Sequence, residues 1–332
     1  GLVGSEMCIR DSDKIYATNL NKGLNMYKKA TVTGRFAPSP SGVMHLGNLS
    51  SYLLAWLDAR SKDGKIILRI EDLDPDRCSK EYALLLADDL RFLGLDWDNE
   101  LSEEYYQSSR TELYEDIFGQ LLKHDMLYPC YCSRSQRLAA SAPHPGECTH
   151  DTGCRCRHLS RSERMELERL GKRPAWKIHV PDKEIIFVDG HYGRIRQNLA
   201  DGGDFIIRRS DGVFAYQLAV SFDDMDMGID RVVRGRDLLS SSARQIWLIS
   251  ELGGSPPEYC HAPLLLSEDG RKLSKRDGDL NIMSLRQNHT PEEIIGYLAA
   301  RLGLGNGKPI SVQKLLQTFD WSLVPKNDIT IK

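Results

Sequence analysis

The alternation of apolar and polar positions predicts a strand and then a helix, twice, in the first third of the chain. Residues 27–40, YKKATVTGRFAPSP, begin β-rich and run into a turn that contains two prolines. Residues 45–61 carry apolar side chains at helical spacing, whereas residues 64–74, GKIILRIEDLD, form the short apolar run typical of a strand. This order favours an α/β fold built on a parallel, doubly wound sheet of the Rossmann type.

A second predicted helix follows, with Ser79 as its N-cap and Gly94 as the residue that ends it. Apolar side chains recur between these two residues at positions 82, 86, 90 and 93, which is a helical period. The remaining expected elements are apolar runs of β type within residues 184–190 and 204–224, and helices within residues 242–254 and 291–303.

The opening stretch GLVGSEMCIRDS has none of the features of a targeting peptide. No apolar run follows its first basic residue, Arg10, as a secretory signal would require, and the nearby acids are atypical of an organelle transit peptide. The stretch resembles a sequencing-library adapter translated in one reading frame, so we expect the natural start at Met26. A disordered native tail is the alternative, and neither interpretation assigns a function to residues 1–25.

The distribution of charged residues indicates what kind of molecule the chain could bind. The formal net charge is −3, but residues 134–177 hold ten Lys or Arg against five Asp or Glu. This local excess of five positive charges fits a polyanion, although a solvated surface is the simpler interpretation of such a run. Because no apolar stretch approaches the roughly 20 residues that span a bilayer, and no export signal is present, we expect a cytoplasmic protein without a membrane partner. We also expect a monomer, although no feature of the sequence determines the oligomeric state.

The segment RFAPSPSGVMHLGN, residues 35–48, has the composition of a phosphate-binding loop. Two prolines stiffen the loop, and His45 follows at the first turn of the predicted helix. A helix N-terminus offers unpaired N–H groups and a partial positive charge, which suit a phosphate group. Gly47 has no side chain, so a base or a ribose can approach its backbone closely. The alternative is a structural histidine that caps its own helix.

A second segment, SEDGRKLSKRDGD at residues 267–279, strengthens the phosphate interpretation. It places Lys272, Lys275 and Arg276 in a loop flanked by glycines, which by itself is a basic surface turn. Together with the His-x-Gly loop about 230 residues upstream, it resembles the two ATP signatures of class I aminoacyl-tRNA synthetases. The family forms are His-Ile-Gly-His and Lys-Met-Ser-Lys-Ser, and here they stand as HLGN and KLSKR, with Asn48 in place of the second His.

This resemblance implies a reaction in which a carboxylate attacks the α-phosphate of ATP, with Mg²⁺ accompanying the nucleotide. Negative charge then builds on the phosphate oxygens, so positioning and charge stabilisation supply most of the catalysis. The implied catalytic residues are His45, Lys272 and Lys275. The implied ATP-binding residues are His45, Gly47, Asn48 and Lys275.

Four further segments, GRFAPSPSG, LRIEDLDPDR, YQLAVSFDD and RVVRGRDLLSSSARQ, are similar to the glutamyl and glutaminyl branch of that class. The resemblance implies that L-glutamate is bound by Arg35, Ala37, Ser39, Glu71, Tyr216 and Arg234. Two arginines and one glutamate are the charge complement of a ligand with two carboxylates and one ammonium group. Glu71 also follows an apolar strand, at the edge where doubly wound sheets bind ligands. A solvated carboxylate in an acidic turn is the alternative for Glu71.

Cysteines cluster in one short region. From Met26 onward the chain has seven cysteines, and five of them lie between positions 130 and 156. Two Cys-x-Cys pairs separated by 21 residues suit a tetrahedral structural Zn²⁺ site that staples a small insert in a reducing compartment. Relatives in the family pair one Cys-x-Cys with Tyr and Cys or with Cys-x-His, whereas Thr152 stands here. The expected ligands are Cys130, Cys132, Cys154 and Cys156, with Cys148, His150 and His158 as alternatives for the third and fourth.

These observations divide the chain into five expected parts. They are a non-native leader (1–25), the first half of the nucleotide-binding core (26–129), the inserted zinc-binding module (130–180), the second half of the core (181–250), and the signature loop with a short helical C-terminal segment (251–332).

The expected substrate follows from the resemblance. A full glutamyl-tRNA synthetase continues into a large helical anticodon-binding region, whereas 56 residues follow Arg276 here. The resemblance therefore implies the branch without that region, which activates L-glutamate with ATP and esterifies it onto the queuosine base in the anticodon loop of tRNA(Asp). The alternatives are a truncated glutamyl-tRNA synthetase that charges tRNA 3′ ends, and a non-catalytic RNA-binding relative. The presence of His45, Glu71 and Lys275 argues against the last.

Overall fold

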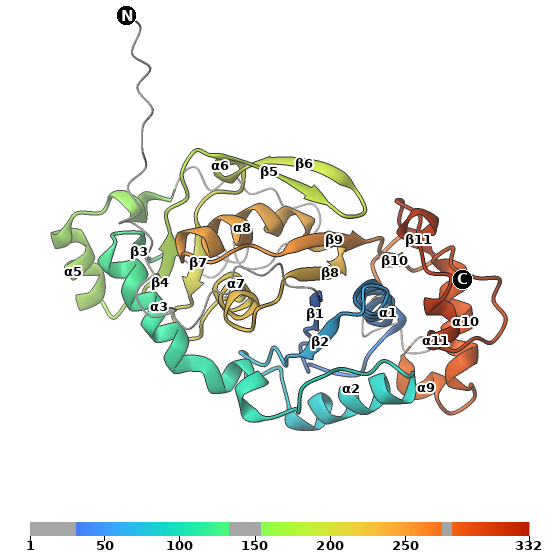
Figure 1. Ribbon diagram of the computed structural model, residues 1–332. Helices are drawn as coiled ribbons and strands as arrows, with labels where there is room; N and C mark the ends of the chain where they lie inside the picture. Colours follow the sequence, from blue (N-terminus) through green and yellow to red (C-terminus); the bar gives the residue numbers. More distant parts are fainter. Residues whose placement is uncertain (1–30, 133–153, 274–280, 332) are drawn as a thin grey trace, which may run out of the picture.

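The computed structural model describes residues 31–132, 154–273 and 281–331 (Figure 1). The elements up to the Cys-rich region are β1 (Thr33–Phe36), α1 (Leu46–Arg60), β2 (Lys65–Leu68), α2 (Lys80–Phe92), η1 (Glu103–Tyr105), η2 (Gln107–Arg110), α3 (Thr111–Lys123) and β3 (Leu127–Cys130). The elements between residues 155 and 262 are η3 (Arg155–His158), α5 (Arg161–Arg169), β4 (Ala175–Ile178), β5 (Glu184–Asp189), β6 (Gly193–Asn198), α6 (Leu199–Gly202), β7 (Phe205–Arg208), α7 (Tyr216–Asp226), β8 (Arg231–Gly235), η4 (Arg236–Ser241), α8 (Ser242–Glu251) and β9 (Glu258–Ala262). The last are β10 (Leu265–Leu266), α9 (Ile282–Leu285), α10 (Pro291–Arg301), α11 (Val312–Leu316), η6 (Trp321–Leu323) and β11 (Ile329–Thr330).

Two pairs of parallel strands lie at the centre of the molecule. β1 pairs with β2, and β8 pairs with β9, both in parallel. The two pairs meet near the start of β1 and β8, where the backbone N–H of Asp230, just before β8, donates to the Thr33 carbonyl oxygen over 3.1 Å. Helix α1 packs against both β1 and β8, and α7 packs against α8 beside these strands (Figure 1). The expected α/β fold with parallel strands is therefore confirmed.

The first two helices form where the apolar spacing predicts them. In α1 the side chains of Leu49, Leu53 and Leu57 are fully buried. In α2 the Ser79 hydroxyl accepts the backbone N–H of Tyr82, and the chain leaves the helix at Gly94 with a positive φ of 77°. A positive φ is costly for residues with a side chain, so glycine suits this exit.

The expectation for residues 204–224 is wrong in its second half. Only Phe205–Arg208 forms a strand, and Tyr216–Asp226 forms helix α7. The error has a physical cause, because α7 is buried around most of its circumference, including the polar residues Gln217, Asp223 and Asp224. A helix that lacks an exposed polar face shows no 3.6-residue period, so its apolar run resembles a buried strand.

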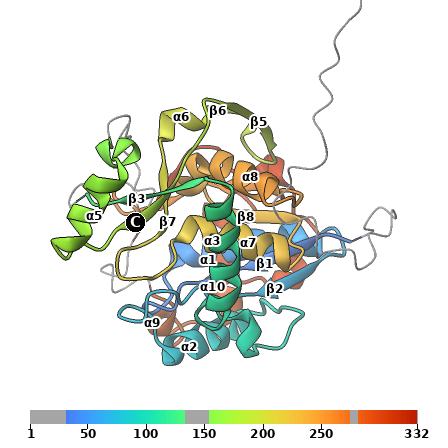
Figure 2. The ribbon, with the colours of Figure 1, turned by 90° about the vertical axis from the view of Figure 1, so that its left-hand side faces the viewer.

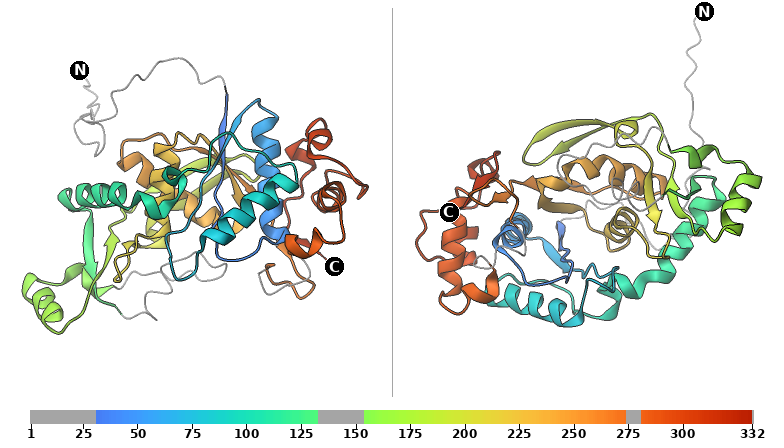
Figure 3. Two further views of the ribbon diagram at one scale, coloured as in Figure 1. Left: turned by 90° about the horizontal axis from the view of Figure 1, so that it is seen from below. Right: turned by 180° about the vertical axis from the view of Figure 1, so that it is seen from behind.

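Two main hydrophobic cores support these elements. One joins α1 and α2 to the C-terminal helices, which contribute Ile294, Ile295, Leu298, Val312 and Leu315. The other joins α3, α7 and α8 to the antiparallel sheet β3–β4–β7. Helix α5 and the C-terminal helices lie at opposite ends of the molecule (Figures 1 and 3). The C-terminal helices thus share the core on which the first signature helix rests.

The β5–β6 hairpin lies on the opposite side of the central strands from α2 (Figure 2). Its two strands pair in an antiparallel register from Glu184 opposite Asn198 to Asp189 opposite Gly193. The backbone N–H of Gly190, just after β5, donates to the Tyr259 carbonyl oxygen over 2.8 Å and so fixes the hairpin to β9. Among the described residues, none of the helices combines the length and the apolar composition that crossing a bilayer requires.

Candidate active site and metal cluster

The two signature segments meet at the start of α1. A Cβ atom added at Gly47 would lie 3.6 Å from the Cβ of Leu273, which stands within the KLSKR signature. Asn281 forms an antiparallel bridge with His45, and the Ile282 N–H donates to the Met44 carbonyl oxygen over 2.8 Å. The residues on both sides of segment 274–280 therefore lie beside HLGN. Lys275 and Arg276 fall within that segment, outside the described residues.

His45 caps its own helix, as the structural interpretation of this residue allows. The Gly47 N–H donates to the His45 Nδ1 over 3.1 Å, and the Asn48 Oδ1 accepts the His45 N–H over 3.4 Å. Asn48 thus completes a reciprocal cap at the position where the family form has a second His. A Cβ atom at Gly47 would lie 3.0 Å from the imidazole ring, so a side chain there would push the ring from its position. The imidazole is consequently held in one orientation at the helix N-terminus.

Lys272 connects the second signature to the segment after β8. Its ammonium group forms an ion pair with Asp237 in η4, three residues after Arg234. The Lys272 side chain is half-exposed and the Asp237 side chain is mostly buried. The signature loop and the loop that follows the predicted glutamate ligand Arg234 are thereby held together.

A buried cluster of charges lies where β1, β2 and α7 meet. The Arg35 Nε donates to the Asp224 Oδ1 over 3.2 Å, and the Arg69 Nη1 donates to the same oxygen over 2.7 Å. The other Arg69 nitrogen, Nη2, donates to the Glu71 Oε1 over 3.0 Å. All four side chains are at most 8% exposed, so these charges interact with little screening by water.

The local charges shift the pKa values within this cluster. Burial raises the pKa of Glu71, and Arg69 and Arg35 only partly offset it. Burial would likewise raise the pKa of Asp224, but Arg69 and Arg35 outweigh this effect, so its pKa lies below the ordinary range. The Asp224 Oδ2 is buried without a hydrogen-bond partner among the described residues. Since an unpaired buried acceptor is costly, a ligand donor placed there would be stabilised.

Tyr216 and the loop after β1 adjoin the same cluster. Burial raises the pKa of Tyr216, and the charges of Arg234, Glu71 and Arg35 also act on its hydroxyl. Ala37 and Ser39 flank Pro38, whose carbonyl oxygen accepts the Glu71 N–H over 2.9 Å. The structure thus brings the six residues of the expected glutamate site to one place in the fold.

Arg234 is the most constrained of these residues. Its Nε donates to the His261 Nε2 over 3.1 Å, and its Nη1 donates to the Gln245 Oε1 over 2.7 Å. Its Nη2 donates to the Ser242 Oγ over 2.9 Å and to the Leu238 carbonyl oxygen over 3.3 Å. Since a guanidinium has five N–H donors, described protein groups hold four and fix its direction.

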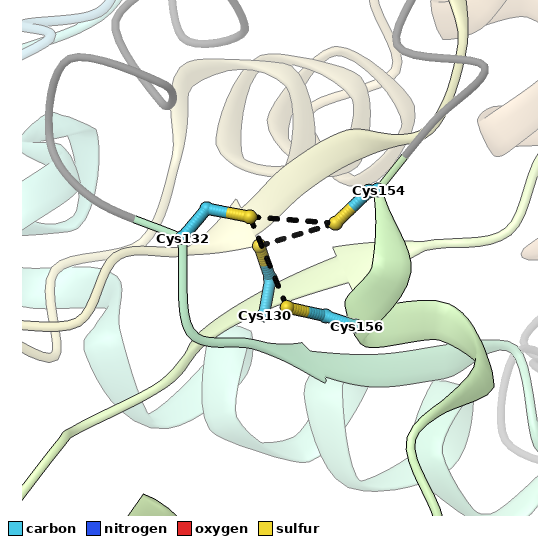
Figure 4. Close-up of side chains that lie close together, drawn as sticks. All are labelled: Cys130, Cys132, Cys154 and Cys156. Carbon is cyan, nitrogen blue, oxygen red and sulfur yellow. Dashed lines mark hydrogen bonds between the residues drawn. The ribbon is translucent and has the colours of Figure 1, made fainter.

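The four cysteines of the two Cys-x-Cys pairs come together between β3 and η3 (Figure 4). The Sγ atom of Cys154 lies 3.6 Å from those of both Cys130 and Cys132, and the Sγ atoms of Cys132 and Cys156 are 3.8 Å apart. A tetrahedral zinc ion with bonds of about 2.3 Å to sulfur requires sulfur atoms about 3.8 Å apart. The four thiols therefore fit the donor set and the spacing of a tetrahedral metal site.

The surroundings of the four thiols also suit a metal. The thiol of Cys130, followed by the Cys156 backbone and the Cys132 thiol, stabilises a thiolate at Cys154 and lowers its pKa to about 5. Among the described residues the cluster consists of these four cysteines, and His158 is not part of it. The other two alternatives, Cys148 and His150, lie outside the described residues.

Comparison with known proteins identifies the family to which this chain belongs. Residues 31–327 match the family described as tRNA synthetases class I (E and Q), catalytic domain. The chain belongs to this family. This synthetase is accordingly an enzyme, a ligase of the aminoacyl-tRNA synthetase type, and ATP with Mg²⁺ fits as its substrate.

Relatives of this synthetase carry two kinds of name. A protein from Nitratidesulfovibrio vulgaris named Glutamyl-Q tRNA(Asp) synthetase is 47% identical over 281 residues, which cover 82% of this chain and 87% of the relative. A protein of the same name from Symbiobacterium thermophilum is 44% identical over 310 residues, covering 90% of this chain and 95% of the relative. Glutamate--tRNA ligase 2 of Syntrophus aciditrophicus is 39% identical over 295 residues, and 60% of its length is covered.

A solved structure agrees with this assignment of the fold. The crystal structure of a glutamate tRNA ligase from Elizabethkingia meningosepticum in complex with its amino acid superposes with a TM-score of 0.73 at 26% identity. The match covers 91% of this chain and 67% of that chain. The expected fold, an α/β catalytic core of the class I synthetases, is thus confirmed.

Sequence reasoning missed several residues that shape the site of this synthetase. Asp224 and Arg69 stand within two of the segments that indicated the family, YQLAVSFDD and LRIEDLDPDR. An acid or a base placed among apolar residues of a predicted element was a usable signal, because such a charge needs a buried partner. Asp189 and His261, by contrast, lie in segments that carried no motif.

His261 makes the stability of this synthetase depend on pH. Burial and the neighbouring charge of Arg234 lower the His261 pKa to about 4, although its hydrogen bond with Asp189 acts in the opposite direction. In the unfolded chain the His261 imidazole has an ordinary pKa near 6.5. Between pH 6.5 and 4 it is therefore protonated in the unfolded chain but stays neutral in the folded chain. We expect the free energy of unfolding to fall as pH falls through this window, with roughly 3 kcal/mol from His261.

Denaturant titrations at several pH values between 7 and 4 measure this dependence, and His261→Gln is the matched variant. The variant should show a shallower loss of stability than the parent as pH falls. His179 and His191, whose pKa values burial also lowers, remain in both proteins and add the same slope to each. Identical slopes for the two proteins would contradict the prediction.

Proposed function

We propose that this synthetase activates L-glutamate with ATP and transfers the glutamate to the queuosine base in the anticodon of tRNA(Asp). The observation that carries the glutamate part is the buried convergence of Arg35, Arg234 and Glu71 beside the two signature segments. The relatives named Glutamyl-Q tRNA(Asp) synthetase, at 38–47% identity over most of their length, support the acceptor.

The charges suggest how glutamate is held. Each arginine would offer its positive charge and its remaining N–H donors to one carboxylate, with a single donor left on Arg234, and Glu71 would supply a counter-charge for the ammonium group. Asp224 offers the buried unpaired oxygen Oδ2 close to the same residues. Ala37, Ser39 and Tyr216 complete the proposed contacts. Such a site favours a ligand with two negative groups over an uncharged amide, because the described partners of Arg234 are uncharged and a missing carboxylate leaves its buried charge uncompensated.

The first step joins glutamate to the nucleotide. A glutamate carboxylate oxygen attacks the α-phosphorus of ATP, a new C–O–P linkage forms, and pyrophosphate leaves with the electrons of the broken P–O bond. In this proposal His45, the N–H groups at the start of α1, Lys272 and Lys275 would offset the charge that develops on the phosphates. Gly47 and Asn48 complete the proposed nucleotide site, and Mg²⁺ would accompany the ATP phosphates.

The second step passes the glutamate to the nucleic acid. A hydroxyl group of the queuosine base attacks the activated carbonyl carbon, an ester forms, and AMP leaves. An anticodon loop can present such a base because its nucleotides are single-stranded and can be splayed outward. The exposed basic side chains of the Cys-rich region would bind the loop phosphates, and those described are Arg155, Arg157, Arg161, Arg169, Lys172 and Arg173. Lys177 is buried and belongs to the interior.

The four cysteines are proposed to hold a structural Zn²⁺. The insert around them has a small core of its own, with Tyr128, Cys130 and Cys156 buried, and α5 contains no buried residue. The small apolar core of the insert contributes little stability, and a closed tetrahedral zinc site would supply the rest. Clustered reduced thiols also fit the proposed cytoplasmic location, where disulfides are rare. We propose that the enzyme acts as a monomer.

The glutamate part of the proposal predicts adenylate formation in the absence of tRNA. The residues of the proposed site all lie within one catalytic core, so glutamate-dependent exchange between ATP and labelled pyrophosphate should proceed without added RNA. Glutamine and aspartate in place of glutamate serve as controls. Exchange that strictly requires tRNA, or that proceeds equally well with glutamine, would count against the glutamate assignment.

The acceptor part predicts that an anticodon stem-loop is sufficient. Labelled glutamate should attach to a short tRNA(Asp) stem-loop that contains queuosine and should fail to attach to the same loop with guanine. Attachment should weaken steeply as salt rises, since phosphate contacts release counterions. If label appears instead on the 3′ end of tRNA(Glu), the chain has the activity of a glutamate tRNA ligase and the acceptor proposal is wrong.

A further inference from the structure

Asp189, His261 and Arg234 form a continuous chain of buried hydrogen bonds. The Asp189 Oδ2 lies 2.6 Å from the His261 Nδ1, and the Arg234 Nε lies 3.1 Å from the His261 Nε2. The side chains of Asp189 and His261 are both 0% exposed. The three residues come from β5, β9 and β8, so the chain of contacts crosses from the hairpin to the central strands.

We propose that Asp189 and His261 are positioning residues, which fix one tautomer of the His261 ring and thereby direct Arg234 toward glutamate. The inference rests on the proposed function, in which Arg234 binds a substrate carboxylate. It extends that function to two residues that the described hydrogen bonds connect to the predicted substrate ligands through Arg234.

The tautomer follows from donor and acceptor chemistry. A guanidinium nitrogen can donate a hydrogen bond but cannot accept one, so the His261 Nε2 must present its lone pair to the Arg234 Nε–H. A neutral ring then carries its proton on Nδ1, which donates it to Asp189. The Ser242 hydroxyl, 3.3 Å from the same Nε2, is the other neighbour of that nitrogen. One arrangement of protons therefore satisfies all of these groups.

Asp189 is itself held by the backbone. Its Oδ1 accepts the N–H of His191 over 3.0 Å and that of Tyr192 over 2.9 Å. The backbone N–H of His261 lies 3.2 Å from Oδ2 and 3.3 Å from Oδ1. These contacts stabilise the ionised carboxylate and lock its plane, so the acceptor for the His261 Nδ1–H does not rotate away.

The remaining contacts of Arg234 explain why direction matters. Gln245, which accepts from the Arg234 Nη1, donates to the Gln217 Oε1 over 3.0 Å, and the Gln217 Nε2 donates to the Ser241 Oγ over 3.0 Å. Described protein groups hold four of the five N–H donors of Arg234, so one N–H donor is left for a carboxylate. A small rotation of the guanidinium would turn this donor away from the substrate. Catalysis requires well-oriented contacts, so such a rotation would weaken glutamate binding.

Asp189→Asn tests the inference without changing the size of the side chain. The amide group of the new side chain would donate to the His261 Nδ1, which moves the ring proton to Nε2 and sets it against the Arg234 N–H. We expect the KM for glutamate in pyrophosphate exchange to rise roughly tenfold to a hundredfold, the scale of one unmade buried hydrogen bond. The KM for ATP should stay within about twofold.

Two variants of His261 separate the contact with Arg234 from the contact with Asp189. His261→Gln places an amide oxygen near the Nε2 position, where it can accept from Arg234, and should keep most glutamate affinity. His261→Asn keeps a donor for Asp189 but has no acceptor for Arg234, and should raise the KM for glutamate as Asp189→Asn does. Nitrogen NMR shifts of the His261 ring report the tautomer directly in the parent and in Asp189→Asn.

Each outcome decides between positioning and mere packing. If both His261 variants lose glutamate affinity equally, or if Asp189→Asn lowers only the melting temperature, the two residues are structural and the inference is wrong. If Asp189→Asn does not fold, the order of the two His261 variants still decides. Arg234→Gln is the separate arm for the proposed function, because an unchanged KM for glutamate in that variant would remove Arg234 from the glutamate site altogether.

Discussion

Replacing Arg234 by glutamine is expected to lower kcat/KM for glutamate by about a hundredfold or more. In the proposed site the change removes a buried positive charge opposite a glutamate carboxylate, and breaking such a charge pair costs about 2–5 kcal/mol because the partner stays buried. The His261 Nε2 and the Gln245 Oε1 also lose their donor. Pyrophosphate exchange measured as a function of glutamate and of ATP separates the effect on each substrate.

The same strand supplies a matched control in Arg231. Its Nε and Nη2 donate to the two oxygens of the buried Asp58 over 2.8 and 3.0 Å, away from the proposed glutamate site. Arg231→Gln should therefore destabilise the protein, since it leaves Asp58 poorly paired, while the KM for glutamate stays near that of the parent. Equal losses of glutamate affinity in Arg231→Gln and Arg234→Gln would mean that the effect is one of folding and not of binding.

The spacing of apolar residues and the helix caps predicted α1, α2 and β2, because these signals lie within the elements themselves. The bounds of α1 and α2 follow from apolar spacing and from the caps at His45 and Ser79, which act within one helical turn. The strand β2 follows from a short apolar run that ends in acids. Helix α7 escaped because burial on nearly all sides removes the polar face that gives a helix its period.

In the candidate site, too, residues within sequence motifs could be predicted, whereas their distant partners could not. Arg35, Glu71 and Arg234 were identified because they stand in segments that resemble a family, and chemistry suggested their roles. Their partners were not identified, because the Arg69–Asp224 pair joins residues 155 positions apart and the His261–Asp189 pair joins residues 72 apart. A hydrogen bond between distant residues depends on tertiary packing, which no local pattern encodes.

The HLGN signature shows how one residue can satisfy two interpretations. The sequence is consistent with His45 as a helix cap or as a nucleotide ligand, and in the structure it caps the N-terminus of α1. Capping fixes the ring and leaves the partial positive charge of α1 in place beside the second signature. A structural role and a proposed nucleotide-binding role are therefore compatible in the same side chain.

Changing Cys130 to serine is expected to abolish stoichiometric zinc binding and to unfold the insert locally. Cys130 is fully buried, and a hydroxyl is a much weaker ligand for zinc than a thiolate. Structural zinc sites contribute apparent binding free energies on the order of 10 kcal/mol, and the insert has little apolar burial with which to replace them. Metal analysis of the purified protein should give about one zinc per parent chain and a small residue in the variant. Limited proteolysis should cut the variant within residues 130–177.

Cys260→Ser is the matched control, because Cys260 is equally buried but lies in β9, in the central core. Its zinc content should equal that of the parent even if its melting temperature falls, since a buried hydroxyl without a good partner destabilises the core. His158→Ala should likewise keep its zinc, because His158 stands apart from the four thiols. Full zinc in Cys130→Ser, or loss of zinc in His158→Ala, would show that the four cysteines are not the ligand set. A parent protein that binds no zinc while its insert resists proteolysis would show that packing and thiol hydrogen bonds alone hold this region together.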